Sequence, residues 1–148
     1  MKSKKADWFE VAVRYLGQGE NGLLKTVTEQ YVAEGATYAE VEESIVKEIT
    51  GFGGTDISIK SIRQASFAEF VCTEDEVDEK LFKAKVQLVA LDENLGKEKR
   101  TGIVYLVQAA DIDVARNYIK RLYSDSMADY ELVQLVETPF VEVLQNEQ

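Results

Sequence analysis

Apolar and polar side chains alternate along residues 9–15 with the two-residue period of a half-buried strand. The apolar members of this run are Phe9, Val11, Val13 and Tyr15. A glycine-rich stretch follows over residues 17–22, and residues 25–33 resume a strand-like pattern. The pattern therefore predicts a β-hairpin near the start of the chain.

A helix is predicted over residues 38–50. Thr37 and Glu40 have the spacing of a capping box, and Gly51 is expected to end the helix in the left-handed conformation. The apolar side chains at helical spacing are Tyr38, Val41, Ile45 and Ile49. Residues 57–62 then return as a strand whose alternation slips by one residue, which predicts a β-bulge near Ser61, and residues 67–71 continue it or add a short strand.

The same order of patterns recurs after residue 80. A second hairpin is predicted around a turn at residues 94–96, followed by a helix over 112–124 capped by Asp111 and a strand near 130–135. Matching positions differ by 73 or 74 residues, as Phe9 and Phe82 do. Two similar but unrelated units are the alternative to this internal repeat.

The predicted fold class is α+β, with two fused β-β-α-β repeats. Each repeat has an antiparallel sheet with one helix, and an approximate two-fold axis relates the repeats within a single domain, residues 1–148. The repeats cover about 7–72 and 81–145, and the acidic segment 73–80 connects them.

Composition and charge limit the expected cellular location of the protein and the classes of partner it can bind. The net charge is −10, which disfavours general attraction to phosphate. The first residues lead into a strand pattern instead of the apolar stretch of a signal peptide, and no run of 18 apolar residues occurs. With the single Cys72 no intramolecular disulfide can form. We expect a cytoplasmic protein with no membrane partner.

Most catalytic schemes lack their residues in this chain. It contains no histidine, which removes Ser-His and Cys-His nucleophiles and His-ligated zinc. Residues 51–54 are glycine-rich but run from helix to strand, the reverse of a phosphate-binding loop. We therefore predict no catalytic, cofactor-binding or metal-binding residues and no cofactor.

Carboxylates are the chemical resource that remains. They occur at Asp111 and Asp113, at Asp92 and Glu93, and in the connector, where capping, turn formation and solvation are the simplest explanations. A carboxylate-dependent enzyme is the third alternative for function.

Two features are candidates for interaction. Trp8 is opposite in phase to Phe9, so we expect it to point away from the main core, toward a second layer, a subunit interface or a ligand. The second hairpin, residues 80–102, has six basic and three acidic side chains, a net charge of +3 in an acidic protein. Its candidate contact residues are Lys83, Lys85, Lys97, Lys99 and Arg100. A solvated outer face that protects an exposed strand is the simpler explanation.

Several segments together resemble one known family. They are residues 92–100 (DENLGKEKR), 105–109 (YLVQA), 127–130 (MADY) and 137–139 (ETP), with Trp8-Phe9 and residues 28–31 (TEQY) in the first half. The chain resembles the domain-of-unknown-function 4494 family, which is found in gut bacteria and their mobile elements. The resemblance covers almost the whole chain, but it implies no activity, cofactor or catalytic residue.

The sequence favours a non-catalytic binding or adaptor module for a protein partner, which includes a second copy of the chain. A nucleic-acid-binding protein that uses the basic hairpin is the alternative.

Overall fold

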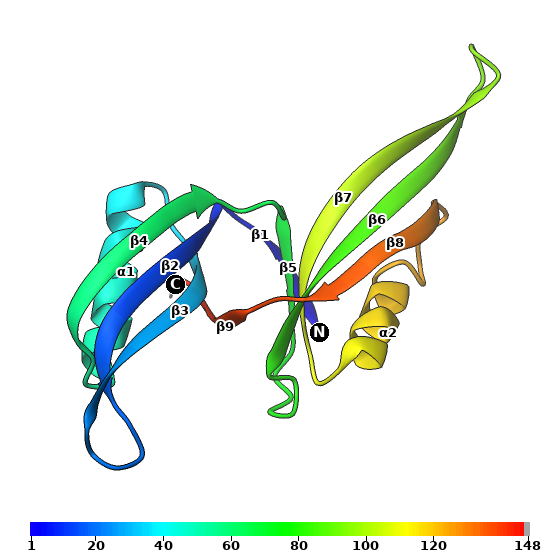
Figure 1. Ribbon diagram of the computed structural model, residues 1–148. Coiled ribbons are helices and arrows are strands. Elements are labelled where there is room, and N and C mark those ends of the chain that lie inside the picture. The colour runs from blue at the N-terminus through cyan, green and yellow to red at the C-terminus, as the bar shows by residue number, and fades with distance from the viewer. Residues whose placement is uncertain (147–148) are drawn as a thin grey trace. The chain divides into compact units, whose positions relative to one another are not determined.

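The computed structural model describes residues 1–146 and is mixed α+β, with nine strands and two helices (Figure 1). The elements in chain order are β1 (Lys2–Lys5), β2 (Trp8–Gln18), β3 (Leu24–Glu34), α1 (Tyr38–Gly51), β4 (Thr55–Gln64), β5 (Glu69–Cys72), β6 (Lys80–Asp92), β7 (Lys97–Ala109), α2 (Ile112–Leu122), β8 (Asp129–Glu137) and β9 (Phe140–Leu144). No helix among these residues is long and apolar enough to span a membrane.

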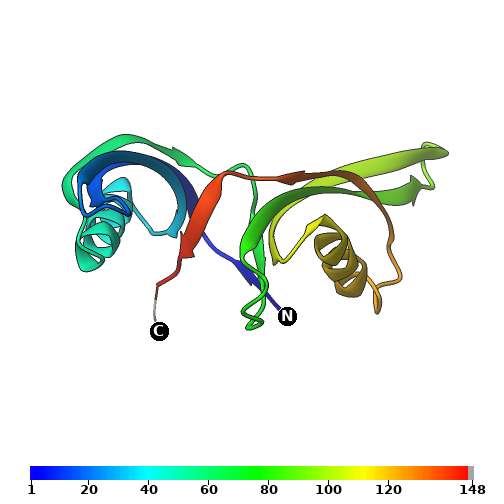
Figure 2. The ribbon, with the colours of Figure 1, turned by 60° about the horizontal axis from the view of Figure 1, so that its bottom comes forward.

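The chain forms two compact units. Unit 1 comprises residues 1–5 and 66–138, and its five-stranded sheet has the order β1-β5-β7-β6-β8. Unit 2 comprises residues 6–65 and 139–148, and its four-stranded sheet has the order β4-β2-β3-β9. Each unit has one helix on one face of its own sheet (Figure 2).

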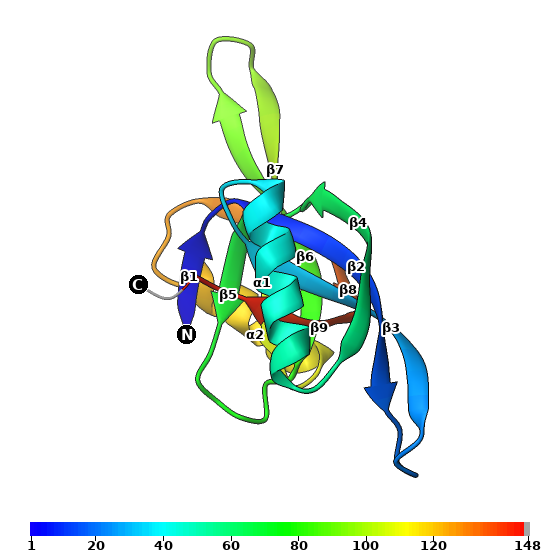
Figure 3. The ribbon, with the colours of Figure 1, turned by 90° about the vertical axis from the view of Figure 1, so that its left-hand side faces the viewer.

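The core of unit 2 lies between α1 and the sheet (Figure 3). Alternate residues of β2, from Phe9 to Tyr15, meet Val41, Ile45 and Ile49 of the helix, all of which are buried. Burial of apolar surface at about 25 cal/mol per Å² makes this contact the main source of stability of the unit. The prediction of the first hairpin and helix is confirmed.

The ends of α1 follow from local chemistry. The backbone N–H of Glu40 donates to Oγ1 of Thr37 at 3.2 Å, so the predicted N-cap is confirmed. At the other end Phe52 is the C-cap, and the residue with positive φ (93°) is Gly53. The prediction that Gly51 takes the left-handed conformation is therefore wrong, because the helix continues through Gly51 before the chain turns.

Unit 1 repeats this arrangement. Alternate residues of β6, from Phe82 to Val86, and buried residues of β7 pack against Ala115 and Ile119 of α2. The N–H of Val114 donates to Oδ1 of Asp111 at 2.9 Å, as the sequence predicts for the cap.

The edge strands β4 and β8, which pair with the first strand of each hairpin, contain a bulge at matching positions. In β4, Ile59 pairs with Val13 and Ser61 pairs with Ala12, so Lys60 is the extra residue, next to the predicted site. In β8, Leu132 pairs with Val86 and Gln134 pairs with Lys85, so Val133 is the extra residue. Val133 lies 73 positions after Lys60, the same offset that relates the two repeats. Bulges of this kind interrupt the ladder of an edge strand.

The short strand at the end of each predicted repeat joins the sheet formed by the other repeat. β5 follows β4 in sequence but pairs in parallel with β7, and β9 follows β8 but pairs in parallel with β3. The two pairings are equivalent. Phe70 pairs with Leu106 and Val143 pairs with Val32, and the matching residues of the two pairs differ by 73 or 74 positions, as elsewhere in the repeat. The element order thus recurs with equivalent pairing, whereas a common origin of the halves and a two-fold axis stay predictions.

Candidate functional site

The structure divides the candidate basic residues of the second hairpin between two faces. Lys83 and Lys85 share the sheet face that points away from α2, whereas Lys97 and Lys99 are in phase with the core residues of the other face. Arg100 lies on the face of Lys83 and Lys85. The five side chains therefore do not form one continuous patch.

Arg100 is engaged within its own sheet. Its Nη1 donates to Oε2 of Glu131 at 2.7 Å and to Oε1 of Gln87 at 3.2 Å, and its Nη2 lies 3.5 Å from Oε2 of Glu98. The hydrogen bond to Glu131 is the main cause that raises the pKa of Arg100, with the charges of Glu131 and Glu98 adding to it. A phosphate would have to compete with these carboxylates, which weakens the case for nucleic acid.

Trp8 lies in a buried environment. It opens β2 in the phase opposite to Phe9, but its side chain is only 3% exposed. Of the three expected environments, burial contradicts an exposed contact with a ligand or a partner and agrees with a covering second layer. Sequence alternation gives the face of a sheet but does not show whether that face is covered.

The carboxylates singled out in the sequence have structural tasks. Asp111 caps α2, Asp113 pairs with Arg116 at 2.9 Å, and Asp92 accepts hydrogen bonds from backbone N–H groups in the hairpin turn. One connector residue, Asp78, contradicts the expectation of a solvated segment, because it is 2% exposed.

Asp78 binds three donors at once. Its Oδ2 accepts from the hydroxyls of Thr73 and Tyr118, both at 2.6 Å, and its Oδ1 accepts from the N–H of Ala110 at 2.8 Å. The backbone oxygen of Asp78 also accepts from Nε2 of Gln108 at 2.7 Å. Asp78 thus fixes the connector to α2 and to the end of β7, a structural role that its position in an acidic run conceals.

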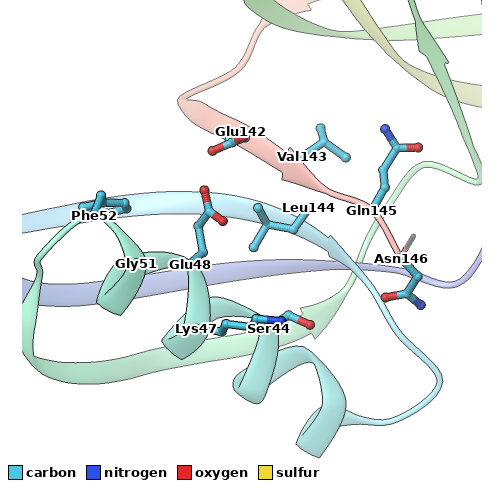
Figure 4. Close-up of a pocket in the computed structure, with 10 residues that line it drawn as sticks. All are labelled: Ser44, Lys47, Glu48, Gly51, Phe52, Glu142, Val143, Leu144, Gln145 and Asn146. Atoms are coloured by element: carbon cyan, nitrogen blue, oxygen red, sulfur yellow. The ribbon is translucent and has the colours of Figure 1, made fainter. Parts of the chain in front are cut away.

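A groove of about 760 Å³ lies in unit 2 between the second half of α1 and β9 (Figure 4). The side of α1 contributes Ser44, Lys47, Glu48, Gly51 and Phe52, and the other side is formed by residues 142–146. Phe52 is 53% exposed and packs edge-on against Tyr15, which fixes an accessible aromatic ring at this end of the helix. The lining combines the apolar Phe52, Val143 and Leu144 with polar and charged side chains.

Two carboxylates meet in this groove. Glu48 comes from α1 and Glu142 from β9, and Figure 4 shows them on facing walls. Partial burial, the negative charge of Glu48 and a hydrogen bond to Glu48 together raise the pKa of Glu142. A cation placed between the two carboxylates would therefore be stabilised.

Tyr31 interacts electrostatically with both carboxylates of the groove. Burial first, then the charges of Glu29, Tyr15, Glu142 and Glu48, raises the pKa of Tyr31.

Tyr15 hydrogen-bonds to Glu29, and burial, with this hydrogen bond second, raises the pKa of Tyr15 to about 12. Both phenols stay neutral at ordinary pH and leave Glu48 and Glu142 as the acidic groups at the groove.

The chemistry available in the groove is recognition of positive charge. Within residues 1–146, no group of three or more His, Cys, Asp or Glu side chains is placed to hold a metal ion. Glu48 and Glu142 stand far apart in the sequence, so no spacing motif could identify them. The capping of α1 and the unexpected pairing of β9 bring them together.

The edge of β9 adds a second recognition element. β9 is the last strand of its sheet, and among the described residues no strand pairs with its outer edge. Unpaired N–H and C=O groups along such an edge can accept an added strand.

The matches to known proteins agree with the lack of a recognisable motif. No curated protein and no solved structure matches the chain. One family model matches residues 7–146, which is nearly the whole length. The chain therefore belongs to the family described as "Domain of unknown function (DUF4494)".

Proposed function

We propose that this protein is a non-catalytic binding module whose partner is another protein. The observation that carries the proposal is the open edge of β9 beside the groove of unit 2. A strand edge supplies backbone hydrogen bonds and the neighbouring groove supplies side-chain contacts, and the two together are the usual elements of peptide recognition by sheets.

The other sheet edges in unit 2 and unit 1 suit this purpose less well. The outer strands β4 and β8 are each interrupted by a bulge, at Lys60 and Val133, which breaks the row of hydrogen-bonding groups. On the other side of unit 1, β5 is paired with β1, and this edge strand has only four residues. The outer edge of β9 has no neighbouring strand among the described residues, and it borders the groove of about 760 Å³.

Site-specific photo-crosslinking tests the proposal. We would place benzoylphenylalanine at Val141 of β9, whose side chain is 47% exposed, and in a matched protein at Met127, which is fully exposed in unit 1. We expect a discrete cross-linked protein from the native cell with Val141 alone, and, in the purified complex, slower amide hydrogen exchange over residues 141–145. Equal products at both positions, or unchanged exchange in the complex, would refute the proposed surface.

The nucleic-acid alternative has its own support in the hairpin of net charge +3, which includes Lys83 and Lys85 on one face. A site that neutralised about four phosphates would give a log-log salt slope near −3 on single strands. We expect no retention of DNA or RNA at micromolar protein and low salt, because the basic residues are split between two faces. Retention that Lys83→Glu with Lys85→Glu abolishes would favour the alternative.

A further inference from the structure

The sheet of unit 1 has one more strand beyond β5, the equivalent of β9. Its strand β5 is paired on the outer edge by β1, a short antiparallel strand with the basic sequence KSKK. Lys5 lies directly opposite Glu69, and Lys4 lies opposite Phe70. Opposed residues of an antiparallel pair project on the same face, so Lys5 and Glu69 form a cross-strand pair of opposite charge.

β9 occupies in unit 2 the place that β5 occupies in unit 1. Val143 beside Val32 matches Phe70 beside Leu106, and Glu142 therefore corresponds to Glu69, 73 positions earlier. The electrostatics agree, because the charge of Glu69 contributes to the raised pKa of Tyr105 as the charge of Glu142 does to that of Tyr31.

The two units differ at the next position in the sheet. In unit 1 the order continues from β5 to β1, whereas in unit 2, over residues 1–146, the order ends at β9. The groove lies along β9 on the face where Glu142 meets Glu48 of α1. Lys47 is the single basic side chain among the lining residues, so the two carboxylates outnumber it.

We propose that the outer edge of β9 accepts a basic extended segment of a partner protein as an antiparallel fifth strand, with a lysine opposite Glu142. This inference rests on the proposed function and specifies the chemistry of the partner. The lysine side chain would project on the groove face, where it would lie between Glu142 and Glu48. The geometry is that of Lys5 and Glu69 in unit 1.

Binding of this kind is linked to protonation. The pKa of Glu142 is raised in the free protein, and a nearby ammonium group would lower it, so binding releases a proton. Affinity for a basic segment is therefore expected to increase as the pH rises through the carboxyl range, and to level off above the raised pKa of Glu142.

A peptide titration tests the occupant. The probe is the octapeptide TVKSKKVT, which places the sequence of β1 between strand-forming residues, and the control peptide is TVESEEVT. We expect the probe to shift backbone amide resonances of residues 141–146 and 44–52 of the full chain, with Kd on the order of 10⁻⁴ M. The control peptide should give no shifts at the same concentration.

Matched variants separate a specific strand from general attraction to an acidic protein. Glu142→Lys should weaken binding of the probe at least tenfold and allow binding of the acidic control peptide, and the milder Glu142→Gln should weaken it about threefold. Glu76→Lys makes the same charge change in the exposed connector of unit 1 and should alter affinity by less than twofold. Far-UV circular dichroism would verify that each variant is folded.

Three results would overturn the inference: no shifts at 1 mM probe, shifts outside the β9 groove, or equal weakening by Glu76→Lys and Glu142→Lys. A partner cross-linked at Val141 together with failure of the probe would reject the basic strand but leave the binding module standing. Absence of both would reject the two proposals together.

Discussion

Substitution of Asp78 is the sharpest test of how unit 1 holds its connector. In Asp78→Ala three donors lose their acceptor in a buried site: the hydroxyls of Thr73 and Tyr118 and the N–H of Ala110. Water has little access there, because Asp78 is 2% exposed. Each unsatisfied buried donor costs about 1–3 kcal/mol.

The three costs are not fully additive, since the connector can relax toward solvent once the carboxylate is gone. We expect Asp78→Ala to lower the free energy of unfolding by about 3–5 kcal/mol, the size seen when one partner of a buried charged network is removed. Asp78→Asn keeps one oxygen acceptor, and the hydroxyl groups can turn to accept from its amide, so the expected loss is about 1–3 kcal/mol. Tyr118→Phe removes one hydrogen bond without changing shape and should cost about 1–2 kcal/mol.

Urea unfolding followed by circular dichroism, with the slope m compared between proteins, measures these losses. Asp75→Asn is the matched control, because Asp75 is exposed and its carboxylate accepts from the N–H of Val77 at 3.2 Å within the same segment. The control should lose less than about 0.5 kcal/mol. If Asp78→Ala loses no more than the control, the network does not stabilise the fold. If Asp78→Ala does not fold, Tyr118→Phe provides the decisive measurement.

Two further substitutions probe unit 2. Gly54→Ala should lower the free energy of unfolding by about 2 kcal/mol or more, because the added Cβ would lie 2.4 Å from Cγ2 and 3.0 Å from the backbone oxygen of Ile49. In the control Gly51→Ala the added Cβ meets open space, so the change should be neutral or stabilising. Thermal unfolding of the two variants compares them. The pKa of Glu142 is raised in the folded state, so the folded protein loses stability as the pH rises from the ordinary carboxyl value through the raised one. Glu142→Gln removes this loss and should therefore raise Tm at pH 7 by about 1–2 °C. That gain should vanish below about pH 4, where Glu142 is protonated in both states, and a gain independent of pH would contradict the role of Glu48.

Local patterns predicted most of the secondary structure. The caps at Thr37 and Asp111 and the slip near Ser61 follow from short-range chemistry, and all three are confirmed as caps and a bulge. The helix stop was misplaced at Gly51 because the glycines nearby offer several positions for the turn, and the chain uses Gly53.

Long-range pairing was beyond local patterns. β5 and β9 lie at the ends of their repeats, and nothing in the sequence indicates that each joins the sheet formed by the other repeat. The groove depends on that pairing, so Glu142 could not be linked to Glu48. For the same reason the sequence did not predict the burial of Asp78 and did not decide between the environments of Trp8, since exposure depends on what covers a residue rather than on its phase or charge.

The place of β9 in unit 2 also affects the order of events during synthesis. Residues 6–65 emerge early, but their sheet gains β9 only after residues 140–144 have been made, and in the meantime β3 presents an unpaired edge. A chain in that state has low protection against pairing with a neighbouring nascent chain. Because closure of so long a loop precedes the last parallel pairing, we expect the final folding phase to be slow and to depend on contacts distant in sequence, with chaperone demand concentrated in that interval.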